Sequence, residues 1–190
     1  MIAVVDCEDS YVNNLVAVVE SFGEPTVTVS EKSVKSLFRL DPDALILSPG
    51  PGKPSPVRGS WTAFDYYVGK IPILGVCLGH QTIGAASNGK IICKERPTHG
   101  KITTVTHDGG MLFKNIPKSF SAVRYNSLVL DPNCVGKNLK INAVDNYGDV
   151  MAISDENRRI FGVQFHPESF MTEYGGILIH NFVKMVNDDF

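Results

Sequence analysis

The amino-acid sequence predicts an α/β protein: an open, mostly parallel, twisted sheet with helices on both faces, together with a smaller antiparallel sheet. Short apolar runs rich in β-branched residues alternate with longer helix-like segments through the first half of the chain, which is typical of βαβ units. Past about residue 90 the runs become shorter and turn residues separate them, which predicts hairpins. Because 43% of the 190 residues are hydrophobic, residues 1–190 can form a single domain with a substantial core.

The first half is predicted to be doubly wound. Its apolar runs have the length of strands and are bounded by Gly, Pro or polar residues, as expected for strands buried on both faces. The expected strands are 2–6 (IAVVD), 26–30 (TVTVS), 44–48 (ALILS) and 71–76 (IPILGV), with helices over about 11–22 and from about Leu78.

The second half is predicted to contain antiparallel strands and one closing helix. Gly109-Gly110 and Tyr147-Gly148 are the expected hairpin turns. The last helix is expected over about 176–186, where apolar residues keep helical spacing. The expected strand segments are KIICKE (90–95), KITTVTHD (101–108), INAVDN (141–146), VMAISD (150–155) and RRIFGVQF (158–165).

Composition disfavours several classes of function. A formal net charge of -2 provides no broad basic field, so we expect neither nucleic acid nor membrane as a partner. The start MIAVVDCEDSY lacks an export pattern, and no stretch reaches the roughly 18 apolar residues of a spanning helix, so a cytoplasmic protein is expected. The four cysteines, Cys7, Cys77, Cys93 and Cys134, show neither C-x-x-C nor metal-ligand spacing, which predicts free thiols and no metal site.

One of these cysteines stands where a catalytic residue would be displayed. Cys77 follows an apolar run and lies between Gly75 and Gly79, the thiol counterpart of a Gly-x-Ser-x-Gly nucleophile elbow. A side chain at either glycine would crowd a tight strand-to-helix turn. The N-terminus of the following helix favours a thiolate at this position. A buried, inert cysteine is the alternative, which a partner base would exclude.

A candidate base and its orienting group follow the strand expected at 158–165. Pro167 ends the pairing of that strand, and the flanking residues His166 and Glu168 would point to the same side of an extended segment. A carboxylate on one ring nitrogen stabilises the imidazolium and leaves the other nitrogen to transfer protons. Each residue alone could be an ordinary surface group, but together with the cysteine elbow they predict a nucleophile, base and orienter.

Such a nucleophile needs N–H donors for the oxyanion that it creates. The amide of Leu78, at the start of the expected helix, is one candidate. The loop Ser48-Pro49-Gly50-Pro51-Gly52 is another, because its prolines have no N–H and its glycines let a ligand approach the backbone closely. A rigid turn without a ligand is the simpler interpretation of this loop.

These motifs together resemble the class I, triad-type glutamine amidotransferase domains. LSPGPG, GVCLGHQ and FHPES stand in the order and spacing of that family, and the resemblance covers essentially the whole chain. It implies a flavodoxin-like fold in which Cys77 attacks the carboxamide of glutamine. His166 would transfer the proton with Glu168 behind it, and ammonia and then glutamate would leave.

The resemblance also implies how glutamine is bound. RYNSL (124–128) is similar to the family's Arg-Tyr-His-Ser-Leu, whose backbone at the Ser-Leu step holds the amino-acid end of glutamine. Asn126 takes the place of the usual histidine there. The residues implied to bind substrate are Gly50, Pro51, Gly52, Gln81, Ser127 and Leu128, with Leu78 and Gly52 in the oxyanion hole.

Within the family, the Pro-Gly-Pro-Gly loop, the His-Gly-Lys of 99–101 and Thr172 after His-Pro-Glu-Ser are most similar to the glutaminase subunits of anthranilate synthase. The glutaminase subunits of aminodeoxychorismate synthase are closely similar. Both resemblances imply a hetero-oligomer with a chorismate-using synthase subunit, here anthranilate synthase component I of tryptophan biosynthesis. No cofactor is implied in this chain, and magnesium is expected on the synthase partner. His99 and Lys101 are candidate partner contacts.

The N-terminal match to the family is looser. DCEDSY (6–11) stands where family members commonly have Asp-Asn-Tyr-Asp-Ser-Phe, a segment that lies near the synthase partner in the family. Asp9 or Ser10 is expected to cap the following helix in either case.

Other functions remain as alternatives. A non-catalytic glutamine-binding regulatory subunit would be expected to lack the thiol, the histidine or the carboxylate, and this chain has all three. A cysteine peptidase or γ-glutamyl hydrolase could use the same elbow, but Gln81 and the Pro-Gly-Pro-Gly loop favour free glutamine. A metal enzyme is disfavoured by the absence of ligand spacing.

Overall fold

A computed structural model describes residues 1–94 and 100–187, and the chain forms α, 3₁₀ and β elements over these ranges. Each helix that it describes is too short, or not apolar enough, to span a lipid bilayer. The strands are β1 (Ile2–Asp6), β2 (Thr26–Ser30), β3 (Ala44–Leu47), β4 (Ile73–Val76), β5 (Ile91–Cys93), β6 (Lys101–His107), β7 (Ser119–Arg124), β8 (Leu128–Leu130), β9 (Lys140–Asp145), β10 (Val150–Asp155) and β11 (Ile160–Val163). The helices are α1 (Val12–Glu20), α2 (Gly59–Tyr67), α3 (Leu78–Ala86) and α4 (Gly175–Asn187), with 3₁₀ segments η1 (Glu31–Arg39), η2 (Met111–Phe113) and η3 (Glu156–Arg158).

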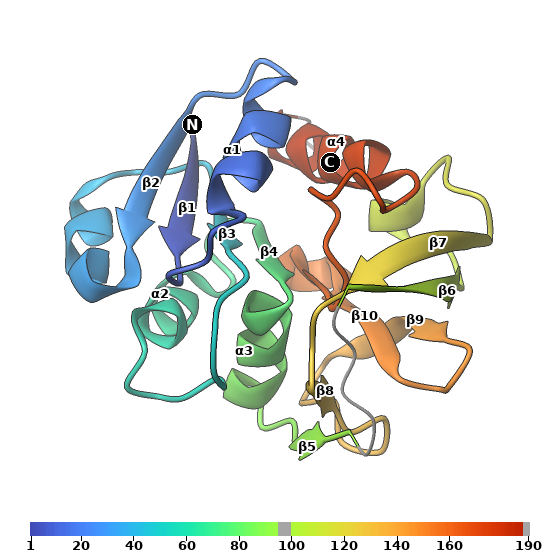
Figure 1. The fold of residues 1–190 in the computed structure, drawn as a ribbon. Helices are drawn as coiled ribbons and strands as arrows, with labels where there is room; N and C mark the ends of the chain where they lie inside the picture. Colours follow the sequence, from blue (N-terminus) through green and yellow to red (C-terminus); the bar gives the residue numbers. More distant parts are fainter. Residues whose placement is uncertain (95–99, 188–190) are drawn as a thin grey trace.

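Over the described residues, the main sheet has nine strands in the order β2-β1-β3-β4-β11-β10-β9-β6-β7. The first five of these are parallel to one another, in the order of a flavodoxin-like sheet, and the other four continue the sheet with antiparallel pairing. β5 and β8 form a separate antiparallel pair. The predicted architecture is therefore confirmed, including the smaller sheet and the change of pairing along the chain (Figure 1).

The parallel strands are apolar throughout because both of their faces are covered. In β1, Ile2 and Val4 belong to the core beneath α1 and α4, whereas Ala3 and Val5 belong to the core beneath α2, α3 and η1. All four side chains have no exposed surface. Alternation along the strand thus places successive residues in opposite cores, as the doubly wound prediction requires. Figure 1 shows α1 beside α4, and the two helices are in contact.

Several element boundaries differ from those predicted. The strand expected to reach residue 165 ends at Val163, and the strand expected from residue 71 begins at Ile73. Gly109-Gly110 is not a tight hairpin turn: both glycines have positive φ, and η2 lies between β6 and its partner β7. The Tyr147-Gly148 turn between β9 and β10 is confirmed, with Gly148 at φ 81°.

The predicted cap of α1 is also wrong. The N-cap position is Tyr11, and no side chain accepts a hydrogen bond there. Instead, Asp9 Oδ1 accepts the N–H of Tyr11 at 2.6 Å, and Asp6 Oδ1 accepts the N–H of Glu8 at 2.8 Å. The aspartates therefore organise the turns before the helix, which is the local bonding that Asp also favours.

The turn from β4 into α3 depends on two glycines. A Cβ on Gly75 would lie 2.5 Å from the carbonyl of Gly79, and a Cβ on Gly79 would lie 2.2 Å from the carbonyl oxygen of Leu47 in β3. Real Cβ atoms do not approach backbone atoms so closely. Glycine is needed at both positions because α3 packs directly against the backbone of β3 and β4.

His80 of α3 lies against β11 and is fully buried. Neither ring nitrogen has a hydrogen-bond partner of acceptable geometry among the described residues. A Cβ on Gly162 would lie 2.9 Å from its Nδ1, so that glycine makes room for the ring. Burial lowers the pKa of His80 to about 3. The imidazole is therefore neutral in the folded protein.

We predict that Gly79→Ala lowers the free energy of unfolding by about 1–3 kcal/mol, because the added methyl group collides with the Leu47 carbonyl. Gly176→Ala is the matched control, since its Cβ would meet nothing within 4 Å and alanine favours a helix. Urea denaturation of both variants tests this. Equal stability of the two variants would contradict the close contact.

We also predict that His80 makes the fold sensitive to acid. With a pKa of about 3 when folded and 6.5 when unfolded, only the unfolded chain binds the proton between these values, so stability falls as pH falls below 6.5. Between pH 7 and pH 5 the loss due to this residue is about 2 kcal/mol. His80→Leu should reduce the pH dependence of unfolding by this amount, as measured by urea denaturation at both pH values. An unchanged difference would contradict the neutral, buried imidazole.

Candidate active site

The candidate residues meet at one edge of the sheet. Residues 48–52 follow β3, Cys77 follows β4, and the segment with His166 and Glu168 follows β11. These three strands are neighbours and run parallel, so their carboxyl ends lie together. Open α/β sheets bind ligands at this edge. Figure 1 shows α3 continuing directly from the end of β4.

Cys77 has the backbone conformation of a strained turn residue. Its φ is 53° and its ψ is -100°, and it is the N-cap residue of α3 without a capping side chain. Its N–H donates to the carbonyl oxygen of Val163 in β11 at 2.8 Å, which fixes the turn to the sheet. A non-glycine residue adopts positive φ only when its surroundings enforce it, and such strain is common at active sites. The predicted nucleophile elbow is therefore present.

His166 and Glu168 form the predicted pair. His166 Nδ1 lies 2.6 Å from Glu168 Oε1, and both residues are buried, with exposures of 3% and 8%. The expected reason for this contact is wrong, because β11 has ended and the two residues lie in a turn. That turn is held at the carbonyl of His166, which accepts bonds from the Thr172 hydroxyl at 2.7 Å and from the N–H of Ser169 at 3.3 Å.

The charge of the His166 ring follows from its neighbours. Burial acts to lower the pKa of His166, but the interactions of the ring with the Cys77 sulfur and the Glu168 carboxylate outweigh burial and raise the pKa to about 10. The Nε2 atom is buried and has no hydrogen bond of acceptable geometry among the described residues. The ring is an imidazolium at neutral pH.

The loop after β3 packs against the start of α3. A Cβ on Gly50 would lie 2.6 Å from the Cys7 carbonyl oxygen and 2.8 Å from the Leu78 side chain, so only glycine fits there. Gly52 has a φ of 83°, in the region that favours glycine. The structure thus brings this loop to the N-terminus of α3, as the oxyanion prediction requires.

Arg58 holds this loop, and sequence reasoning missed it. Its guanidinium donates to the Pro51 carbonyl at 2.8 Å and to the Cys7 carbonyl at 3.3 Å. Glu31 orients the guanidinium from the other side, with contacts of 2.6 and 3.1 Å. Both side chains are mostly buried. No local sequence pattern predicts the role of Arg58, because its partners are two carbonyls and a carboxylate from three other segments.

Gln81, a predicted substrate-binding residue, contacts another predicted substrate-binding residue, Leu128. Its Nε2 donates to the Leu128 carbonyl at 2.9 Å and to Gln164 Oε1 at 3.0 Å. The Ser127 carbonyl accepts the N–H of Lys94 at 2.8 Å. Gln81 therefore lies beside the Ser127–Leu128 step, although both carbonyls of that step already accept bonds from the chain itself.

Gln164 was treated only as a strand residue in the sequence. It is fully buried, and its Nε2 lies 3.7 Å from Cys77 Sγ, within hydrogen-bond distance for sulfur. Its position two residues before His166 was the available signal, since both side chains then reach the same sheet edge.

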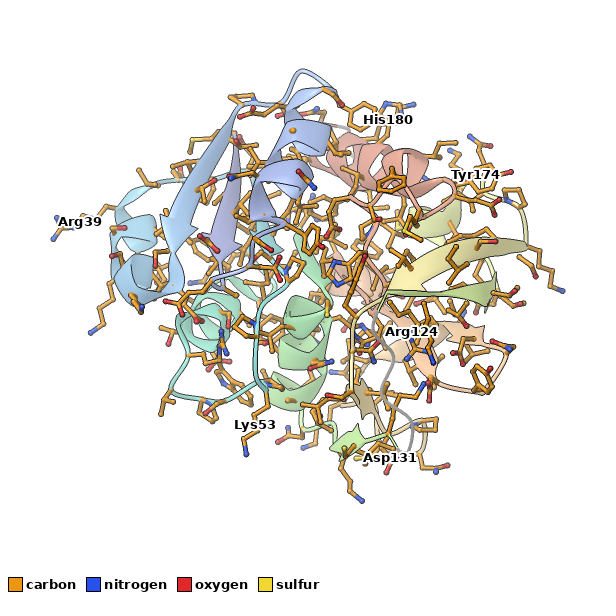
Figure 2. The ribbon with its side chains drawn as sticks, in the orientation of Figure 1. Arg39, Lys53, Arg124, Asp131, Tyr174 and His180 are labelled. Atoms are coloured by element: carbon orange, nitrogen blue, oxygen red, sulfur yellow. The ribbon has the colours of Figure 1, made fainter. Side chains whose placement is uncertain are left out.

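A buried charged group lies behind Leu128. Arg124, which is 1% exposed, forms ion pairs with Asp145 and Asp149. Its Nε donates to Asn126 Oδ1 at 3.1 Å, and Asn126 Nδ2 donates to the Leu128 carbonyl at 2.8 Å. Figure 2 shows Arg124 in the interior of the molecule, whereas Arg39 extends outward from the edge. Asn126 is thus part of a buried polar chain.

Two tyrosines cover the histidine. The ring of Tyr125 meets His166 edge-on at a centroid distance of 5.1 Å, and Tyr11 meets it at 6.1 Å. The two tyrosine rings stack on each other at 5.8 Å. Tyr11 comes from the segment after β1, so the part of the chain with the looser family match lies at the site.

Cys77 itself is only 7% exposed. An open cleft of about 520 Å³ reaches the site at Leu128 and is bordered by Lys53 and Trp61, but Cys77 does not line it. A cleft of about 710 Å³ lies elsewhere, between the ends of β6 and β9. In this conformation Cys77 is enclosed.

Lys101 begins β6 and is exposed, whereas His99, the other predicted partner contact, lies outside the described residues. Within the described residues, no three His, Cys, Asp or Glu side chains are grouped so that they could hold a metal ion.

Comparisons with known proteins agree with this geometry. The sequence profile of the family described as "Glutamine amidotransferase class-I" matches residues 3–186. An anthranilate synthase component 2 from Archaeoglobus fulgidus is 42% identical over 189 residues, covering 99% of each chain. A Bacillus subtilis protein named aminodeoxychorismate/anthranilate synthase component 2 is 38% identical over 186 residues, covering 97% of this chain and 96% of its own.

The fold is similar to that of a solved structure from Thermoplasma acidophilum, described as a GMP synthase subunit. The TM-score is 0.84 and the sequence identity 23%, with 98% of this chain and 93% of that chain covered. At this identity the likeness concerns the fold alone. The family profile and the full-length relatives go further, and on these grounds the chain belongs to the class-I glutamine amidotransferase family.

Proposed function

We propose that this chain is the glutaminase subunit of an anthranilate synthase, which hydrolyses L-glutamine and passes ammonia to a chorismate-using synthase subunit. The observation that carries the proposal is the buried arrangement of Cys77 in an elbow turn with the His166–Glu168 pair at 2.6 Å. The choice of synthase is supported by the relatives from A. fulgidus and B. subtilis, whose names both include anthranilate synthase component 2.

The first half of the reaction releases ammonia. The Cys77 thiolate attacks the carboxamide carbon of glutamine, which forms a C–S bond and moves the carbonyl electron pair onto oxygen. His166 Nε2 then donates its proton to the amide nitrogen as the C–N bond breaks. Ammonia leaves, and a γ-glutamyl thioester remains on Cys77. Because the pKa of His166 is raised, the ring is protonated at neutral pH and carries the proton that this step needs.

The second half releases glutamate. Neutral His166 removes a proton from water as the water oxygen attacks the thioester carbon. The C–S bond then breaks, the sulfur leaves as a thiolate, and the imidazolium is restored beside it. Glu168 holds Nδ1 protonated at 2.6 Å, so Nε2 is the atom that exchanges protons in both halves.

Both halves pass through an oxyanion, for which we propose the N–H groups of Leu78 and Gly52 as donors. Leu78 is the first residue of α3, so its N–H has no partner within the helix. The packing of Gly50 against Leu78 places the loop beside it. This is what the proposal requires of two donors from different segments.

Glutamine is proposed to lie between the loop Gly50–Pro51–Gly52 and the Ser127–Leu128 step. Gln81 uses both of its amide hydrogens within the chain, which leaves its Oε1 for the α-ammonium group of glutamine. The Leu128 carbonyl already accepts two bonds, so the N–H groups of this step are the better ligands for the α-carboxylate.

We propose that the synthase subunit opens and aligns this site. A nucleophile that is 7% exposed is poorly accessible until docking shifts the population towards an open state. Ammonia protonates in bulk water and loses its nucleophilicity, so an enclosed route into the partner is needed. The chain's own residues supply the nucleophile, the base and the oxyanion donors, so the proposal needs no cofactor in this subunit; magnesium would act in the synthase.

We predict that glutamate release from glutamine requires Cys77 and increases when a chorismate-using anthranilate synthase subunit is added. Cys77→Ala should lower the rate by at least about 10³-fold, because the thioester cannot form. Cys134→Ala is the matched control, since that cysteine is exposed and is not part of the site. Glutamate release and anthranilate formation are measured together.

Anthranilate as the aminated product would support the proposed synthase. Because the B. subtilis relative carries both names, an aminodeoxychorismate synthase subunit is tested in parallel. Glutamate release that depends on Cys77 but responds only to this second partner would overturn the choice of synthase. No glutamate release with either partner would overturn the glutaminase.

A second prediction concerns the reactivity of Cys77. The alkylation of Cys77 by iodoacetamide, measured at each cysteine by peptide mass spectrometry, reports the thiolate. His166→Asn removes the charged ring beside the sulfur, so the alkylation rate at pH 7 should fall by at least about tenfold. His180→Asn, a change in α4 away from the site, should leave this rate unchanged. Equal rates for His166→Asn and the unsubstituted protein would contradict this effect of the ring.

A further inference from the structure

A buried amide lies beside the reactive sulfur. Gln164 has no exposed surface, and its Nε2 is 3.7 Å from Cys77 Sγ. The mechanism proposed above uses the sulfur, the histidine and the oxyanion donors, but it assigns no role to the amide of Gln164. This side chain contacts the Gln81 amide at one end and the Cys77 sulfur at the other.

The direction of the amide can be deduced, because a backbone carbonyl can only accept hydrogen bonds. The Leu128 carbonyl lies 2.9 Å from the side-chain amide of Gln81, so the Gln81 NH₂ group must face it. The second hydrogen of that NH₂ meets Gln164 at 3.0 Å, so the atom of Gln164 at this contact must be the oxygen. The NH₂ of Gln164 therefore points at Cys77.

The same logic extends to a charged group. Arg124 can only donate, so the atom of Asn126 that it meets at 3.1 Å is the oxygen. The NH₂ of Asn126 then faces the Leu128 carbonyl at 2.8 Å, on which Gln81 also converges. The ion pairs of Arg124 with Asp145 and Asp149 hold its end of this chain.

We propose that Gln164 is a positioning residue for the Cys77 thiolate: its amide N–H, oriented by Gln81 and the Leu128 carbonyl, donates to the sulfur and holds it in the charged form. The inference rests on the proposed function and deepens it. A donor to sulfur stabilises the thiolate relative to the thiol, because the hydrogen bond is stronger to the charged atom. It also fixes the direction in which the sulfur attacks.

Two different groups, the His166 ring and the Gln164 amide, then interact with the sulfur. His166 supplies the positive charge and moves during the reaction between its protonated and neutral forms. Gln164 cannot exchange protons, so its hydrogen bond to sulfur is available in every step in which the thiolate is present. It acts in the same way on the attacking thiolate of the first half of the reaction and on the leaving thiolate of the second half.

The test is the pH profile of Cys77 alkylation in Gln164→Met, which keeps the length of the side chain and removes the donor. We expect the rate at pH 7 to fall by about tenfold, the effect of one hydrogen bond to a charged group at the weak end of its range. Gln164→Glu should fall at least as far, because a negative oxygen replaces the donor. Asn181→Asp is the matched control: its buried amide donates to the carbonyls of Leu112 and Lys114, and its loss should leave the profile unchanged.

Circular dichroism confirms that each variant is folded. Should Gln164→Met not fold, Gln81→Met replaces it, since this change removes the orienting donor and leaves Gln164 in place; a smaller shift in the same direction is expected. Profiles within twofold of the unsubstituted protein would overturn the inference, because a purely structural role would alter stability and not the pH profile. Alkylation needs no glutamine, and in the isolated chain it proceeds through the small fraction of molecules in the open state, equally for each variant compared. A chain that shows these shifts but releases no glutamate would therefore overturn the proposed function and leave this inference standing.

Discussion

The site depends on the close contact between the start of α3 and the backbone of β3 and β4. Gly75 and Gly79 permit this contact, since any side chain at either position would overlap backbone atoms. In this tight turn Cys77 has a positive φ, and it stands at the edge where the parallel strands end. Everything else in the site is arranged around a sulfur that the backbone has already placed. In a looser turn, His166 and Gln164 would still lie near Cys77, but they would not both reach its sulfur.

Electrostatics then acts on this fixed geometry. The site is enclosed, so neighbouring charges are poorly screened, and the ring of His166 is held protonated despite a burial that opposes its charge. His80, three residues after Cys77 and in the helix α3, is buried without a charged partner and stays neutral. Two histidines in similar burial therefore carry different charges, because one faces a sulfur and a carboxylate and the other faces the backbone of β11.

The parts of this structure that could be predicted from sequence are those set by local pattern. The strands of the parallel half are recognisable because both faces are buried, and Cys77, His166 and Glu168 because glycines and a proline frame them. Arg58 could not be found in this way, since it acts on the carbonyls of Cys7 and Pro51 from a different segment. Gln164 was missed although it stands two residues before His166, because its contacts with Gln81 and Cys77 are made only in the fold. The helix cap predicted at Asp9 was wrong because an aspartate side chain can accept a hydrogen bond from a turn as well as from a helix, and the local pattern does not distinguish the two.

The order of the strands has a consequence for how the protein is made. β11 inserts beside β4, so the residue that contacts the nucleophile stands 87 positions after it in the chain. A growing polypeptide can form the β1-to-β4 layer and its helices long before β11 has left the ribosome, yet Cys77 then has neither histidine nor amide beside it. Pairings of such long range are slow to form. The sulfur therefore acquires its neighbours His166 and Gln164 only when the last parallel strand joins the sheet.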